Sequence, residues 1–138
     1  MRSGKVQRIV LPVFGFGVWL VAALASSGAQ AASYWQPTVL EVKELPRYCH
    51  GQFIAELRNE PGATISGCGG GMNHFCPGLV LMNRAMKSTA PKAERRGLVS
   101  QARQELEYTR ARMAPNCPIA PDVQAADSRL RLLEMMVK

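Results

Sequence analysis

The sequence is poor in the residues from which most catalytic and metal sites are built. Its 138 residues include two histidines, His50 and His74, and its acidic residues lie mainly on the faces of expected helices. It has no Gly-x-Ser-x-Gly motif, and its Gly-rich stretch, 66–71, lacks the Lys-Ser or Lys-Thr pair and the preceding strand of a phosphate-binding loop. These absences argue against nucleophilic and nucleotide-binding enzymes. We therefore expect no enzymatic activity and no cofactor.

Cysteine spacings typical of metal and redox sites are also missing. The chain has no Cys-x-x-Cys pair and no Cys-x-x-Cys-His haem motif. Its four cysteines are Cys49, Cys68, Cys76 and Cys117. We interpret them as structural disulfides, because small exported domains commonly gain stability from such bonds, and the residues alone allow three pairings. A thiol-redox protein is the alternative, and it predicts at least one solvent-reactive cysteine.

The first 31 residues have the pattern of a secretory signal peptide. Three basic residues precede an apolar run, and small residues follow it (Arg2, Lys5 and Arg8; residues 9–25; residues 29–31). We predict cleavage after Ala31, a periplasmic or secreted location, and no membrane span in the mature chain. An uncleaved anchor is the alternative, since the apolar run of 17 residues is at the lower limit of what spans a bilayer.

The charge balance is basic but mild outside the leader. Three of the 17 basic residues and none of the 10 acidic ones lie in the leader, so the remaining 107 residues carry a net charge of +4. The basic residues of the second half are interspersed with glutamates, a pattern typical of solvated helix faces. An exported protein rarely meets nucleic acid, so we expect no nucleic-acid partner.

The mature chain divides into an irregular first part and a helical second part. Residues 32–46 contain one short alternating piece, 38–43, between two prolines, and they predict an extended lead-in. A short helix over 53–58 and a tight, Gly-rich, cross-linked loop are expected next. We assign residues 47–138 to one disulfide-linked helical domain.

Three amphipathic helices account for most of that domain. Each begins at a proline and repeats apolar residues every three or four positions; the expected ranges are 77–87, 91–113 and 121–137. Short proline-marked connections favour antiparallel neighbours, so the second and third helices should form a hairpin with the first packed across one side. The fold class is therefore all-α.

Two local motifs resemble those of a known group. Residues 45–49 read Leu-Pro-Arg-Tyr-Cys, and residues 72–76 read Met-Asn-His-Phe-Cys before a helix that carries Asn83-Arg84-Ala85. These segments resemble exported bacterial proteins of the tetratricopeptide-repeat-like kind, which carry a Leu-Pro-x-Tyr-Cys segment and a His-aromatic-Cys segment before helical hairpins. The resemblance covers about residues 45–86. It implies a helical-hairpin scaffold that holds a partner, with no known catalytic chemistry.

The resemblance also implies how the cysteines pair. Cys49 and Cys76 are the pair shared with that group, which leaves Cys68 for Cys117. This arrangement would tie the Gly-rich loop to the end of the second helix. It would also tie the lead-in to the start of the first helix.

These observations favour a binding protein. We expect a small periplasmic interaction or assembly module that binds a protein partner, as an accessory subunit of an envelope complex. The basic side of the second helix is the expected partner surface, with Arg95, Arg96, Arg103 and Tyr108, and the groove of the hairpin is a second expected surface.

A copper-handling protein is a further alternative. Soft ligands of the kind that bind copper could converge from Met72, His74, Met82 and Met86. Methionines at helical spacing are more often core residues, because their unbranched side chains fill irregular gaps. We therefore assign no metal site, and the copper alternative predicts metal in purified protein.

Overall fold

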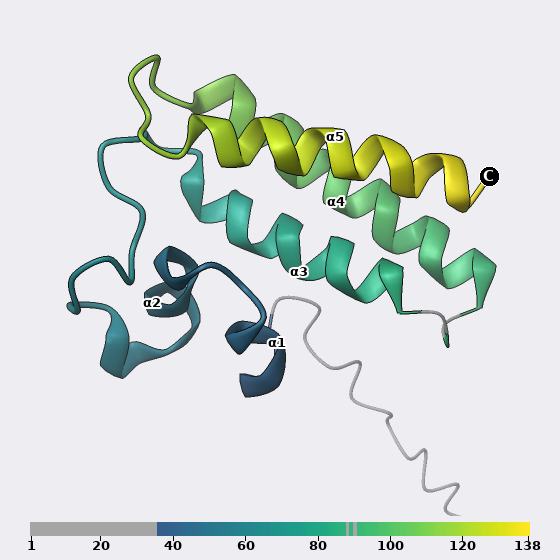
Figure 1. Ribbon diagram of the computed structural model, residues 1–138, viewed down its shortest axis with the longest axis horizontal. Coiled ribbons are helices and arrows are strands. Elements are labelled where there is room, and N and C mark those ends of the chain that lie inside the picture. Colours follow the sequence, from purple (N-terminus) through teal and green to yellow (C-terminus); the bar gives the residue numbers. More distant parts are fainter. Residues whose placement is uncertain (1–35, 88, 90) are drawn as a thin grey trace, which may run out of the picture. The chain divides into compact units, whose positions relative to one another are not determined.

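The computed structural model describes residues 36–138 except Ser88 and Ala90, and the regular elements within this part are all helical (Figure 1). The α-helices are α1 (Val39–Lys43), α2 (His50–Phe53), α3 (Phe75–Met86), α4 (Lys92–Arg112) and α5 (Ala120–Met136). Single 3-10 turns occur at η1 (Arg47–Cys49), η2 (Ala55–Leu57) and η3 (Met72–His74). The all-α prediction is confirmed. The predicted signal peptide, residues 1–31, lies outside the described residues.

The three long helices occur where the periodicity placed them. The bounds of α4 and α5 differ by one residue at each end from the predicted ranges 91–113 and 121–137. The start of α3 lies two residues before Pro77, because the η3 turn leads directly into the helix. The predicted short helix over 53–58 does not form: Phe53 ends α2, the backbone of Ile54 is extended, and only the 3-10 turn η2 follows.

The core lies between α3, α4 and α5, which pack against one another (Figure 1). Eight of the twelve residues of α3 are buried, whereas α4 and α5 bury one stripe each. Gly78 permits the close approach of α3 and α4: a Cβ at this position would lie 3.3 Å from side-chain atoms of Glu105 and Leu106. The long helices therefore form a three-helix unit with α3 as its most buried member.

The lead-in is not extended as predicted for residues 32–46, because Val39–Lys43 is helical. Thr38 and Glu41 form a capping box: the Thr38 hydroxyl accepts a bond from the Glu41 amide, 3.3 Å, and the Glu41 carboxylate accepts one from the Thr38 amide, 2.8 Å. The capping box therefore begins a helix at Thr38 in place of the expected extended stretch. Val42 of this helix is buried.

An ion pair joins α1 to α3. The guanidinium of Arg84 donates to both carboxylate oxygens of Glu41, at 2.6 and 3.0 Å. The bond from Arg84 lowers the pKa of Glu41 from 4.5 to about 2. Burial of the carboxyl group acts in the opposite direction, and the hydrogen bonds from Thr38 lower the pKa further. The short helix is thus held to the three-helix unit by a charge-assisted contact.

Two disulfides complete the fold, and the pairs are Cys49–Cys76 and Cys68–Cys117, as the resemblance implied. The first joins η1 to the start of α3, and the second joins the Gly-rich loop to the connection between α4 and α5. All four cysteines are buried, and none is free. Within the part of the chain described, no helix is both long and apolar enough to cross a membrane.

Candidate functional site

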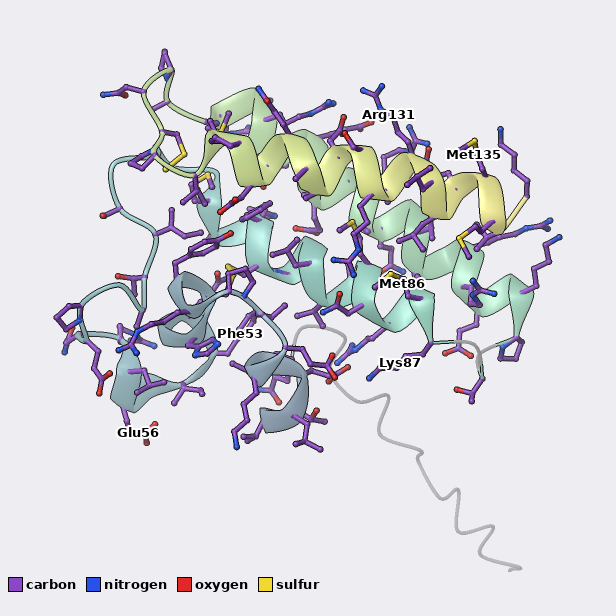
Figure 2. All side chains as sticks on the ribbon, in the orientation of Figure 1. Phe53, Glu56, Met86, Lys87, Arg131 and Met135 are labelled. Atoms are coloured by element: carbon purple, nitrogen blue, oxygen red, sulfur yellow. A yellow bond between two sulfur atoms is a disulfide. The ribbon has the colours of Figure 1, made fainter. Side chains whose placement is uncertain are left out.

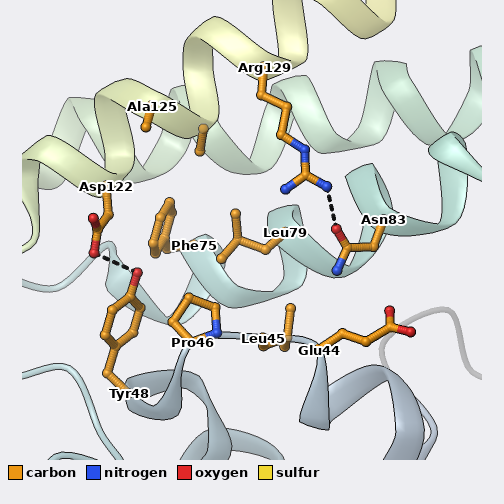
Figure 3. Close-up of a pocket in the computed structure, with 11 residues that line it drawn as sticks. Glu44, Leu45, Pro46, Tyr48, Phe75, Leu79, Asn83, Asp122, Ala125 and Arg129 are labelled. Carbon is orange, nitrogen blue, oxygen red and sulfur yellow. Dashed lines mark hydrogen bonds between the residues drawn. The ribbon is translucent and has the colours of Figure 1, made fainter.

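An open groove of about 500 Å³ lies between α3, α5 and the segment 44–48 (Figure 3). Its lining comes from three separate stretches of chain: Glu44, Leu45, Pro46 and Tyr48; Phe75, Leu79 and Asn83; and Asp122, Ala125, Ala126 and Arg129. The Cys49–Cys76 disulfide holds the first stretch beside the start of α3. The groove is therefore built by the fold as a whole and not by one motif.

The base of the groove is apolar. Leu45, Phe75 and Leu79 are all buried, at 5, 0 and 7% exposure. The ring of Tyr48 stacks on that of Phe75 with their centroids 6.3 Å apart. Because the residues of the base are buried, the apolar surface that a ligand can reach comes from the exposed Pro46 and Ala125 beside them.

One end of the groove carries a hydrogen-bonded acid. The hydroxyl of Tyr48 donates to Asp122 Oδ2 over 2.9 Å (Figure 3). Burial raises the pKa of Tyr48, and the bond to the Asp122 carboxylate raises it further. The phenol therefore stays protonated and fixes the carboxylate in the groove wall.

The other end carries a cation without a carboxylate partner. Arg129 extends from α5 toward α3, and its Nη2 donates to Asn83 Oδ1 over 2.6 Å (Figure 3). The same nitrogen lies 3.3 Å from the sulfur of Met86. Arg129 takes part in no ion pair within the described residues, whereas Arg103, Arg110 and Arg131 each have a carboxylate partner.

An exposed apolar stripe continues from the groove along α5. Ala125, Arg129, Leu132 and Met136 follow one another at intervals of four, three and four residues, so they share one face of the helix. Leu132 and Met136 are 58 and 66% exposed. The groove and this stripe form one continuous surface, which we call the α3–α5 face.

The arginines predicted to bind a partner have partners within the chain. The Nε of Arg95 donates to the carbonyl of Ala85 over 2.8 Å, and that of Arg96 donates to the carbonyl of Val137 over 2.5 Å. Arg103 pairs with Glu134. The first two satisfy carbonyls near the ends of α3 and α5, and Arg96 and Arg103 also line a smaller hollow of about 300 Å³.

Tyr108, the fourth residue predicted to bind a partner, belongs to a different cluster. Its ring centroid lies 4.0 Å from that of His74, and the guanidinium carbon of Arg112 lies 3.7 Å from the Tyr108 centroid. His74 Nδ1 is 2.6 Å from Glu105 Oε2. These contacts fasten η3 to α4, so the predicted surface does not form one patch with Tyr108.

The residues considered for copper do not converge. Met72 and Met82 are core residues, with 5 and 0% exposure, and His74 is bonded to Glu105. Met86 lies eleven residues after the start of α3, about 16 Å along the helix at 1.5 Å per residue. The described residues also contain no group of three or more His, Cys, Asp and Glu side chains placed to hold a metal ion.

Most of the groove escaped the sequence-based interpretation. Tyr48 and Asn83 are far along the chain from Asp122 and Arg129 of α5, and only the fold brings them together. One sequence feature could have indicated the groove, since Arg129 interrupts an otherwise apolar stripe on α5.

Comparisons with protein-family models, curated proteins and solved structures find no match for this chain.

Proposed function

We propose that this protein is a small exported helical module that binds a protein partner in the cell envelope through the α3–α5 face, as an accessory subunit. The observation that carries this proposal is the continuity of the groove with an exposed apolar stripe on α5. Contiguous exposed apolar surface with polar groups at its edge is typical of interaction sites. The tetratricopeptide-repeat-like resemblance of residues 45–86, which implies a partner-holding scaffold, points the same way.

The internal bonds of the basic residues favour the groove over the basic side of α4. Arg95, Arg96 and Arg103 already satisfy acceptors of their own chain. A partner that recruited them would have to replace these bonds, and the net gain would be small. The α3–α5 face offers apolar area that makes no such contacts, together with a guanidinium that lacks a counter-charge.

The chemistry of the groove fits binding better than catalysis. Of its hydroxyl and carboxyl groups, Tyr48 and Asp122 are bonded to each other, and the raised pKa of Tyr48 makes its phenol a weaker acid. A nucleophile needs a neighbouring base that lowers its pKa or removes its proton. The lining therefore supplies positioned hydrogen-bonding groups and apolar area.

An exported location agrees with the bonding of the cysteines. Two buried disulfides are typical of proteins that fold in oxidising compartments. A thiol-redox function would require a reactive thiolate at the surface, and the four sulfurs are paired and buried.

Photocrosslinking tests which face the partner contacts. A benzophenone amino acid replaces Ala125 or Leu132 on the α3–α5 face, and Gln104, an exposed residue of α4, serves as the control position. Irradiation of cells that export the full chain should give the same adduct from the first two positions and none from the third. An adduct from Gln104 alone, or equal labelling at all three positions, would contradict the proposal.

A further inference from the structure

We propose that the groove of the α3–α5 face binds an extended segment of the partner. This segment presents an aspartate or glutamate side chain to Arg129 and Asn83, and apolar residues lie on both sides of that acidic residue. This inference deepens the proposed function and rests on it. It specifies the chemistry of the segment that is recognised.

Arg129 has no ionic partner among the described residues of the groove. Arg129 is half-buried between the apolar groups of α3 and α5, and no carboxylate of the described residues pairs with it. A guanidinium removed from water gains most from a hydrogen-bonded anion. Arg131, two residues further along α5, has such a partner in Asp127 and extends from the outer side of the helix (Figure 2).

Arg129 and Asn83 have N–H donors that the described part of the chain does not use. A guanidinium has five N–H donors, and the described bonds of Arg129 to Asn83 and Met86 involve Nη2 alone. The amide nitrogen of Asn83 adds donors on the α3 side, because its oxygen accepts from Arg129. A carboxylate above this pair could accept several hydrogen bonds at once, which is the geometry that favours arginine.

The position of Arg129 within the face favours a side-chain carboxylate over the carboxylate at the end of a chain. Exposed apolar groups lie on both sides of Arg129: Pro46 and Ala125 line the groove before it, while Leu132 and Met136 continue the stripe after it. A segment that filled both sides would pass over Arg129 in its middle. The anion must then come from a side chain within the segment.

The length of the groove fits a short extended stretch. Asp122 and Arg129 are seven residues apart on α5, about 10 Å along its axis. An extended chain covers about 3.3 Å per residue, so roughly three residues separate the two polar ends. Asp122 can accept an N–H of the segment there, since its carboxylate has lone pairs beyond the one used by Tyr48.

Two carboxylates of the groove, those of Glu44 and Asp122, oppose the proposed ligand. Glu44 lines the rim near Asn83, and its side chain extends away from Tyr48 (Figure 3). Its negative charge should weaken the binding of an acidic segment. Removing that charge and removing the charge of Arg129 are therefore expected to act in opposite directions.

Binding of defined peptide mixtures tests this inference. The ¹⁵N-labelled full chain, with its disulfides formed, is titrated with acetylated and amidated pentapeptides whose other positions mix Ala, Ser, Leu and Phe. The central residue is Glu in one mixture and Gln in a second, and a third has central Gln with a free C-terminal carboxylate. We expect the Glu mixture to shift the amide signals of the groove and to bind about tenfold more tightly than the Gln mixture, the gain from one charge-assisted contact.

Variants of the same protein link this preference to Arg129. Arg129→Gln should remove the tenfold preference, whereas Arg131→Gln, the same change elsewhere on α5, should keep it. Arg129→Lys keeps the positive charge and should retain part of the preference, which separates a charge effect from loss of folding. Glu44→Gln should tighten binding of the Glu mixture about twofold, as expected for one exposed like charge.

The outcomes that overturn the inference differ from those that overturn the proposed function. Equal binding of the Glu and Gln mixtures in the groove would reject the acidic anchor and leave groove binding intact. Preference for the free C-terminal carboxylate would replace the side chain by a chain end, and groove shifts on concentrating the protein alone would identify a second copy. If no mixture shifts the groove, the inference fails, and crosslinking from Ala125 and Leu132 decides the proposed function separately.

Discussion

The two halves of the described chain are held together by different means. Residues 36–74 contain only short helices and turns, and they are fastened by two disulfides and by polar bonds such as Glu41–Arg84. Helices α3, α4 and α5 bury continuous apolar stripes and supply most of the core. The first half therefore depends on a few specific bonds, whereas the second depends on packing spread over many residues.

This difference matters because the groove lies at the junction of the two halves. One wall, the segment 44–48, belongs to the bonded half, and the other walls belong to α3 and α5. A change that loosens the first half should open the groove while the helices persist. A change in the helical core should lower the stability of both halves together.

The largest effects are expected from the disulfides. The closed loops of 27 and 49 residues correspond to about 3.5 and 4 kcal/mol in the chain-entropy model. Replacing either pair by alanine should lower the free energy of unfolding by about that amount, measured by urea denaturation, with little change in helix content. Stability equal to that of the native protein would contradict the structural role of the bond.

The two disulfide variants should differ at the groove. Loss of Cys49–Cys76 frees the 44–48 wall from α3, so the amide signals of Leu45 and Tyr48 should shift strongly. Loss of Cys68–Cys117 releases the Gly-rich loop and should leave those signals in place. If the amide signals of Leu45 and Tyr48 shifted equally in both variants, the two disulfides would not act on separate parts of the molecule.

The core of the helical half should be nearly as sensitive. Leu106 is 1% exposed on α4 and packs against α3 at Gly78. Leu106→Ala should cost about 3 kcal/mol through lost burial and the cavity that remains, and it should lower the melting temperature of the whole described unit. Leu132→Ala on the exposed face of α5 is the matched control and should change stability by less than about 0.5 kcal/mol.

The same division explains what the sequence could predict. The ranges of α3, α4 and α5 follow from apolar spacing and from prolines, because each helix buries one regular stripe. The prediction of an extended lead-in was wrong, because a helix of five residues is too short for its periodicity to differ clearly from the alternation of a strand. Only the Thr38–Glu41 capping box identifies this segment as a helix. Apolar spacing predicted the helices that bury a long stripe, and it failed for the short helix that is held by a few single bonds.

The groove of the α3–α5 face was not predicted from the sequence, although the three long helices that form most of the fold were. The sequence places Arg95, Arg96 and Arg103 on a basic helix face, and it does not show that two backbone carbonyls and Glu134 bond these side chains in the folded chain. The reverse holds for Arg129, whose lack of an ionic partner follows from packing between α3 and α5. Charge patterns along one helix do not reveal which acceptors tertiary contacts bring near.

The Glu41–Arg84 pair should make stability depend on acid. The pKa of Glu41 is lowered to about 2 from 4.5, so its contribution is complete above pH 4.5 and is lost as the pH falls toward 2. That shift corresponds to about 2–3 kcal/mol for this partly buried carboxylate. The pair should contribute this amount to the fall in the free energy of unfolding between pH 6 and pH 2, and the Glu41→Gln variant should lack this part of the fall.

The smallest predicted effect is that of the cap of α1. Thr38→Ala removes the hydroxyl that accepts from the Glu41 amide and should cost about 1 kcal/mol, whereas Thr38→Ser keeps the hydroxyl and should be near native. Because α1 leads into the 44–48 wall, the alanine variant should also increase amide hydrogen exchange at Val42 and Leu45 more than at Leu106. Uniform acceleration at all three sites would show that α1 unfolds only with the whole unit. The half held by single bonds would then be as cooperative as the half held by packing.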